Sequence, residues 1–283
     1  MLYLFSFINK TYWKSILLPV MSFVFPMLFI AIVGGVYNIF GQITPTVILP
    51  AAWSIGIMVT TLLCLPQMVF EMKNSIILKR LGVSKYKPWM FYIVLIIFFI
   101  LINFISYICL IATSYLVLIN HVDYLNFMLT HSNIGEVIFA LFMTFVMSLS
   151  IGLFLSSVCK SIVQIQIIGS IILLSSLILS GMVATIILTY GNLPYRVLTF
   201  LSPYTYTNSM LTEAWFWGDS QHNLLHSSIF EPGKVWMSGV LNSNSEANTM
   251  FTTWQKWMNL LIPPAISIVL LGYSFKTLTF NPR

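Results

Sequence analysis

The stretch SILLPVMSFVFPMLFIAIVGGVYNIFGQITPTVILPAAWSIGIMVTTLLCLPQMVF, residues 15–70, contains no Asp, Glu, Lys or Arg. A turn-rich segment, GGVYNIFGQITP at residues 34–45, divides it into two apolar halves. Each half is close to the roughly 20 residues with which a helix crosses the hydrocarbon of a bilayer. Since the bilayer core offers no water to bond the backbone, the sequence predicts two spanning α-helices rather than strands of a barrel.

The composition of the whole chain extends this prediction to an all-α polytopic membrane protein. Apolar residues make up 58% of the chain and charged residues 7%, which leaves too little charge to cover a water-facing surface. We therefore treat residues 1–283 as one transmembrane domain. The uncharged stretches predict six spans, at about 16–37, 47–69, 89–119, 137–158, 162–180 and 257–276.

The placement of Lys and Arg predicts the orientation, because these residues resist translocation and remain cytoplasmic. Only Arg196, Lys234 and Lys256 fall on the opposite side of the predicted spans, where most of the acidic residues also lie. Both termini are thus expected in the cytoplasm of a multi-pass cell-membrane protein. The cytoplasmic set is Lys10, Lys14, Lys73, Lys79, Arg80, Lys85, Lys87, Lys160, Lys276 and Arg283.

Two segments on the cytoplasmic side have amphipathic patterns. Residues 1–15 mix apolar and aromatic residues with Lys10 and Lys14, which favours a short helix in the headgroup region; a frayed tail is the alternative. Residues 70–88 place apolar side chains between basic ones and stop at Gly82 and Pro88, which favours a short helix parallel to the membrane. A basic anchor that serves topology alone is the alternative for that segment.

The region from residue 181 to 256 is predicted to be re-entrant at first and extracytoplasmic beyond. Ser180 and Gly181, followed by GNLP at residues 191–194, interrupt an apolar run in the way a helix that enters the bilayer, breaks and returns would require. After about residue 201 the sequence becomes rich in Asn, Ser and Trp. The tryptophans are Trp215, Trp217, Trp236, Trp254 and Trp257.

The sequence contains no recognisable catalytic or cofactor-binding motif. There is no G-x-x-x-x-G-K-[ST] cradle for nucleotide phosphates, so the chain cannot hydrolyse ATP alone. His222 and His226 have i, i+4 spacing but lack a third ligand, so no metal site is predicted, and the three cysteines fall in or beside spans as small apolar residues. The spans carry no charge of the kind an ion-coupled carrier or an intramembrane enzyme needs. Their notable polar residues are Asn103, Gln164 and Gln166, for which interhelical hydrogen bonds are favoured over cargo contacts.

Four features in order along the chain resemble the permease subunits of ABC exporters of the ABC-2 type. The first is KSILLPVMSFVFPMLF, residues 14–29, similar to an elbow helix leading into a proline-punctuated first span. The second is EMKNSIILKRLGVSKYKPW, residues 71–89, similar to an acidic and basic coupling segment. The third is the stretch at 148–181, with Gly152, Lys160 and a Leu-Ser-Gly end. The fourth, LPYRVLTFLSPYTY at residues 193–206, contains Pro194, Pro203, Tyr204 and Tyr206.

The resemblance, which omits only residues 207–256, implies a dimer of two permeases, either copies or paralogues, each bound to a separate cytoplasmic ATP-binding subunit. It implies that ATPase coupling falls to Glu71, Lys73, Leu78, Lys79, Arg80 and Leu81. The path or re-entrant region would include Ser180, Gly181, Pro194, Pro203 and Tyr204.

The expected function is therefore ATP-driven movement, in the export direction, of an amphipathic or apolar compound, with the fifth span, its re-entrant hairpin and the second span lining the path. One alternative is a membrane partner or assembly protein whose Trp-rich outer loop binds without transport. Another is a membrane enzyme that uses His222 or His226. The sequence leaves the cargo and the choice between homodimer and heterodimer open.

Overall fold

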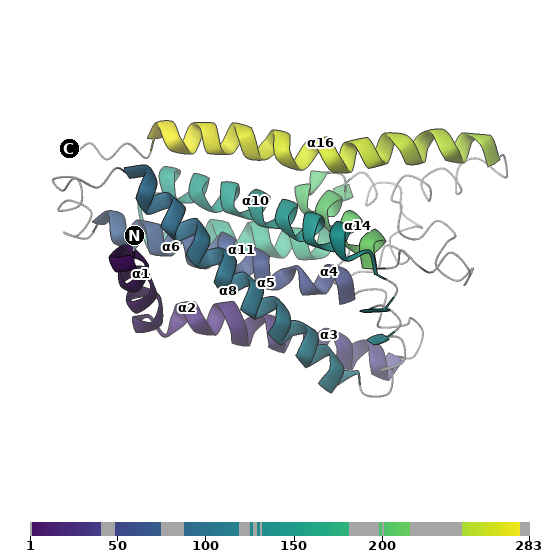
Figure 1. Cartoon of the computed structure of the whole chain (residues 1–283), viewed down its shortest axis with the longest axis horizontal. Helices are drawn as coiled ribbons and strands as arrows, with labels where there is room; N and C mark the ends of the chain where they lie inside the picture. The colour runs from purple at the N-terminus through teal and green to yellow at the C-terminus, as the bar shows by residue number, and fades with distance from the viewer. Residues whose placement is uncertain are drawn as a thin grey trace.

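Most helices of the chain run along one common direction, and one short helix, α1 (Leu2–Lys14), lies across them at one end (Figure 1). The computed structural model describes residues 2–40, 49–74, 88–118, 125–126, 129–130, 132–180, 198–199, 201–215 and 245–277. All regular secondary structure in these ranges is helical. The all-α prediction is confirmed for the described part of the chain.

Six of the described helical segments are long and apolar enough to cross a membrane, which confirms the predicted number. The candidate spans are Leu17–Gly35, Leu49–Met72, Met90–Val117, Ile134–Val158, Ile162–Leu179 and Trp257–Ser274. The first two spans are built from several elements: α2 (Leu17–Pro19), η1 (Val20–Val24) and α3 (Phe25–Phe40), then α4 (Leu49–Trp53), α5 (Ile55–Val59), η3 (Thr60–Cys64) and α6 (Leu65–Asn74). The other four are α8 (Pro88–Val117), α10 (Ile134–Val158), α11 (Ile162–Leu179) and α16 (Ser245–Thr277).

Helix α1 is held against α8 by one apolar face. Leu4, Ile8 and Tyr12 are four residues apart, so they lie on one side of the helix, and all three are buried. The ring of Tyr12 packs edge-on against Phe98 of α8 at 5.3 Å between ring centroids, and its hydroxyl donates to the Leu18 carbonyl at 3.5 Å. These contacts fix the direction in which the chain turns from α1 into the first span.

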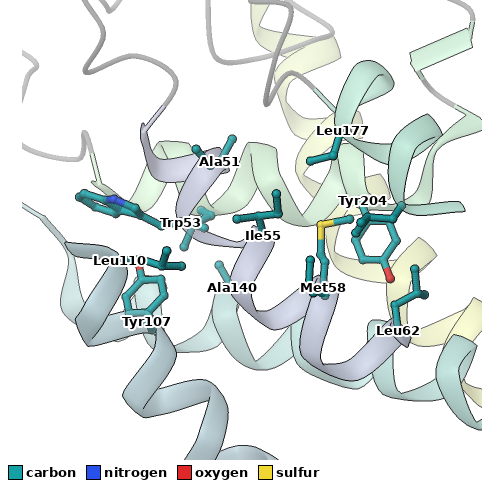
Figure 2. Packing of buried hydrophobic residues seen from close by; sticks show 14 of the residues in the cluster. Ala51, Trp53, Ile55, Met58, Leu62, Tyr107, Leu110, Ala140, Leu177 and Tyr204 are labelled. Atoms are coloured by element: carbon teal, nitrogen blue, oxygen red, sulfur yellow. The ribbon is translucent and has the colours of Figure 1, made fainter. Parts of the chain in front are cut away.

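The second span is the centre of the bundle. In its most apolar window 94% of the residues are buried, against 28% for the first and fifth spans and 22% for the sixth. Figure 2 shows its buried side chains, among them Trp53, Ile55 and Met58, pointing outward in several directions toward neighbouring helices. The described helices therefore form a layer around one enclosed span.

The first two spans each contain one π-helical turn that ends two residues before a proline. The turns are η1, followed by Pro26, and η3, followed by Pro66. Proline has no N–H to donate, so the carbonyl four residues earlier loses its usual helical partner. In the first span that carbonyl belongs to Ser22, and it accepts the hydroxyl of Ser106 in α8 at 2.8 Å.

The second span uses a glycine contact at a carbonyl one position earlier in its turn, five residues before the proline. In η3 the N–H of Leu65 donates to the Thr60 carbonyl, and Pro66 has no N–H. The Thr61 carbonyl therefore accepts no hydrogen bond from Leu65 or from Pro66. The Thr61 oxygen instead faces the backbone of Gly152 in α10, where an added Cβ would lie only 2.3 Å from it. A hydrogen of the glycine Cα points along that direction, which makes a weak C–H···O contact between the two spans.

Side chains at two helix starts define where the fourth and fifth spans begin. The carboxamide oxygen of Asn133 accepts the Glu136 N–H at 3.4 Å at the start of α10. The hydroxyl of Ser161 accepts the Gln164 N–H at 3.2 Å at the start of α11. Both pairs satisfy donors that the first turn of a helix otherwise leaves without partners.

Candidate functional site

The residues expected to contact an ATP-binding partner begin at the end of the second span. Glu71 and Lys73 lie on α6, and Glu71 is partly exposed. The other four expected residues lie outside the described part of the chain, as does the rest of the predicted amphipathic helix. They are Leu78, Lys79, Arg80 and Leu81.

Glu71 is joined to the fifth span through two glutamine side chains. The Gln67 Nε2 donates to Glu71 Oε1 at 2.9 Å, one helical turn apart on α6. The Gln166 Nε2, on α11, donates to Gln67 Oε1 at 3.2 Å. Gln67 is 8% exposed, whereas Glu71 and Gln166 are partly exposed, so this chain of hydrogen bonds is buried only at its middle, where the second and fifth spans meet.

The candidate path residues come together at the other end of α11. Ser180 caps α11 with its N–H bonded to the Ser176 carbonyl, and Pro203 begins the short helix α14 (Pro203–Trp215). The hydroxyl of Thr205 reaches back to the Leu179 carbonyl at 3.4 Å, so the start of α14 lies against the end of α11. Gly181 and Pro194 lie outside the described residues.

Several buried hydroxyls around this junction have no hydrogen bond of acceptable geometry among the described residues. They belong to Ser180 and Ser202, to Tyr204, and to Ser148 of α10, which lies close to Tyr204. An isolated buried hydroxyl costs about 1–3 kcal/mol. Burial also raises the pKa of the Tyr204 phenol above its ordinary value, so this group stays neutral at physiological pH.

Helix α14 is anchored to the second span near the opposite end of the bundle from α1. The hydroxyl of Ser54 donates to Asn208 Oδ1 at 2.8 Å, and the rings of Trp53 and Trp215 meet edge-on at 4.9 Å between centroids. The Trp215 indole N–H donates to the Tyr107 hydroxyl at 3.2 Å, so α8 joins the same cluster. Figure 2 shows Trp53 and Tyr107 side by side, and Tyr204 of α14 beside a later part of the second span, near Met58 and Leu62.

Helix α14 was not predicted from the sequence, and Trp215 was assigned to the Trp-rich outer region without being expected to be buried. Trp215 is 5% exposed, and the second span covers it. Two signals could have identified the helix. Ser-Pro at residues 202–203 is a common helix start, with proline in the first turn. Tyr204, Thr207, Asn208, Leu211 and Trp215 also follow helical spacing, and all are buried.

The polar residues singled out within the spans have different roles. The interhelical hydrogen bonds predicted for two of them are confirmed: Asn103 Oδ1 accepts from the Thr60 hydroxyl of the second span, and Gln166 donates to Gln67. The same prediction was wrong for Gln164, whose Oε1 accepts the Lys160 N–H at 2.9 Å and helps to start its own helix. Its position in the first turn of α11 explains the difference, because N–H groups there need acceptors.

Among the described residues, no three His, Cys, Asp or Glu side chains gather in a way that could hold a metal ion. His222 and His226 lie outside the described residues. The three cysteines do not form disulfides, and Cys64 and Cys159 are buried as apolar side chains.

The fold and these two regions define a polytopic α-helical membrane protein whose spans are joined by buried polar side chains. The chain belongs to the ABC-2 type transporter family, which it matches over residues 2–216. That range contains the first five candidate spans and α14, whereas the sixth span follows it. No curated protein and no solved structure matches the chain.

Membership of this family assigns the chain to the membrane-spanning subunits of ABC transporters. Such permeases have no ATPase of their own and work with ATP-binding subunits. The sequence agrees, since it has no phosphate-binding cradle.

Proposed function

We propose that this permease exports an amphipathic or apolar compound, using ATP hydrolysed by a separate cytoplasmic subunit. The observation that carries the proposal is the family match over residues 2–216, which includes five spans, Glu71 and α14. The uncharged spans support a cargo with little net charge, because nothing in them would compensate a charge crossing the bilayer.

The amino-terminal helix α1 is proposed to be an elbow that lies at the cytoplasmic surface. Its buried face packs on α8 while Lys10 and Lys14 are exposed, as expected at a layer of lipid headgroups. The excess of Lys and Arg at the same side of the spans supports cytoplasmic termini.

The segment at residues 70–88 is proposed to be the coupling helix that contacts the ATP-binding subunit. Its support is the alternation of apolar and basic residues after Glu71, on the side rich in Lys and Arg. ATP-driven closure of the partner would then act first on the end of α6 and change the packing of the spans.

A second permease, either a copy or a paralogue, is proposed to cover the apolar outer face of α11. Val163, Ile167, Ile171 and Leu174 are each more than half exposed, and in one chain alone only lipid would cover them. Their helical spacing places them on one side, as an interface between two bundles requires.

The proposed path runs along α11 and a re-entrant segment between Ser180 and Pro203. The buried hydroxyls without partners at this junction support the proposal, because a polar group of the cargo, or water, would satisfy them. The second span is enclosed by other helices of its own chain, so it can line a path only after α11 or α14 moves away from it.

The test is affinity purification of the tagged chain in mild detergent, with an ATPase assay and identification of the proteins that co-purify. We expect an ATP-binding subunit with the unaltered chain and its loss with the double substitution Glu71→Ala, Arg80→Ala. The matched control is Glu136→Ala, Arg196→Ala, which removes the same two charges from the predicted outer side and should leave the complex intact. Absence of any ATPase under several gentle extractions would refute the proposal.

That negative outcome would favour the second candidate, a non-transporting membrane partner or assembly protein with a Trp-rich external loop. The abundance of Trp after residue 216 is what supports it. The burial of Trp215 removes one tryptophan from the surface that such a protein would use.

A further inference from the structure

The hydrogen bonds between Glu71, Gln67 and Gln166 have a fixed direction. A carboxylate has only acceptor oxygens, so Gln67 must turn its NH2 group toward Glu71. The carbonyl oxygen of Gln67 then faces α11, and Gln166 must supply the donor. The acid at the end of the second span therefore determines which way the amides of both Gln67 and Gln166 point.

This relay of three side chains lies where the second span can bend. Gln67 directly follows Pro66, and Pro66 follows the π-helical turn η3. One turn beyond Gln166 on α11, Gly169 packs on the same turn; an added Cβ would lie 2.7 Å from Leu63 Cδ2 and 3.4 Å from the Leu62 carbonyl oxygen. The fifth span thus contacts the second through Gln166 and, one turn further on, through Gly169. Both contacts lie near η3 and Pro66, where the regular helical hydrogen bonds of the second span are interrupted.

We propose that Gln67 and Gln166 are positioning residues that transmit movement of the segment beginning at Glu71 to the fifth span. The proposal rests on the proposed function, in which that segment contacts the ATP-binding subunit. When the end of α6 moves, the side chain of Gln67 moves with Glu71, to which it is hydrogen-bonded. The hydrogen bond from Gln166 to Gln67 then displaces the start of α11 in the same direction. The far end of α11, at Ser180, lies about 27 Å away along an 18-residue helix, so a small tilt there reaches the candidate path.

A purely structural role makes a different prediction. A neutral hydrogen bond between two spanning helices changes a folding equilibrium by only about threefold on average. If the amides serve packing alone, removing one bond should alter stability slightly and leave the nucleotide-dependent movement of α11 unchanged.

The test measures how fast a cysteine at the cytoplasmic end of α11 reacts with a water-soluble maleimide. Lys160 is exposed, belongs to the predicted cytoplasmic set and directly precedes α11, away from the apolar face proposed to contact the second permease, so Lys160→Cys reports on that end of the helix. The native cysteines are first replaced by Cys64→Ser, Cys109→Ala and Cys159→Ala. Labelling is measured on the complex with its ATP-binding subunit, without nucleotide and after trapping with ATP and vanadate.

Trapping should change the labelling rate about fivefold or more when the relay is intact. Gln166→Lys keeps a donor facing Gln67 and should keep most of this change, whereas Gln166→Met and Gln166→Glu, which offer no donor, should reduce it to within about twofold. Gln67→Met should act like Gln166→Met, and the double variant should be no worse than either, because both remove one connection. Gln164→Met is the matched control on the same helix and should behave like the unaltered chain.

A variant is taken as folded when it retains the ATP-binding subunit and forms a monodisperse complex. If Gln166→Met does not meet these criteria, Gln166→Lys, which keeps a donor, is compared with Gln166→Glu, which does not. The proposal is overturned if the complex forms and hydrolyses ATP but Gln166→Met retains the full change in labelling. It is also overturned if trapping leaves the labelling of Lys160→Cys unchanged in a chain whose Gln67 and Gln166 are both intact. Failure of the unaltered chain to bind any ATPase is a separate result, and that result removes the proposed function itself.

Discussion

Substitution of Gly152 by alanine should loosen the contact between the second and fourth spans. An added Cβ would lie 2.3 Å from the Thr61 carbonyl oxygen and 3.4 Å from Cδ of Pro66. An ordinary C···O contact is about 3.3 Å or longer, so the two backbones must separate by about 1 Å. Neither partner can avoid this by changing a rotamer, since the clash is with main chain.

The expected cost is that of overfilling a packed core, about 1–3 kcal/mol. For a chain of this size that corresponds to a melting temperature lower by about 2–12 °C. Gly169→Ala should cost less, because its close neighbour at 2.7 Å is the end of the Leu63 side chain, which can rotate. Gly272→Ala is the matched control: nothing lies within 4 Å of its added Cβ, and alanine favours a helix more than glycine does.

The assay is thermal unfolding of the purified chain in one detergent, followed by loss of monodispersity on size exclusion. The expected order of melting temperatures is Gly152→Ala lowest, then Gly169→Ala, with Gly272→Ala equal to or above the unaltered chain. A Gly152→Ala protein that melts within about 1 °C of the unaltered chain would contradict the close approach of Thr61 to α10.

Three further outcomes can be measured by the same unfolding assay. Trp215→Ala should lower the melting temperature by about 6 °C or more, as expected for loss of a buried tryptophan, whereas Trp13→Ala, at an exposed position, should change it far less. Ser54→Ala and Asn208→Ala should be non-additive, with a coupling energy of about 0.6 kcal/mol and at most about 1.7; full additivity would exclude the bond between them. Burial raises the pKa of the Tyr204 phenol, so the unfolded chain loses the phenol proton at a lower pH than the folded chain, and the melting temperature falls as pH rises above about 10. Tyr204→Phe should make this decrease smaller, and a variant with the same pH profile as the unaltered chain would argue against burial of the phenol.

The number of spans could be predicted from sequence because lipid imposes one simple requirement on every crossing segment. The absence of charge over residues 15–70 and the four later apolar stretches follow from it directly. The family resemblance, stated from short motifs around residues such as Gly152 and Pro203, is confirmed by the match over residues 2–216.

The interior arrangement could not be predicted in the same way, because hydropathy does not show which helix lies at the centre. The second span is less apolar than the first, yet its window is 94% buried and that of the first span 28%. Gln67 was overlooked beside Gln164 and Gln166, because its role depends on a partner 99 residues later in the chain. Helix α14 was missed because its polar residues, such as Thr207 and Asn208, resemble those of a loop until their burial is known.

The enclosed position of the second span has a consequence for biosynthesis. Ser54 leaves the ribosome 154 residues before its partner Asn208, and Trp53 even longer before Trp215. At about 5–20 residues per second, the second span waits some 8–30 s in the bilayer before α14 exists to cover it. Until then the Trp53 indole can already bond Ser114 of the third span, but Ser54 lacks its Asn208 partner and the Trp53 ring lacks Trp215, so in the unfinished chain one side of the second span is without its cover.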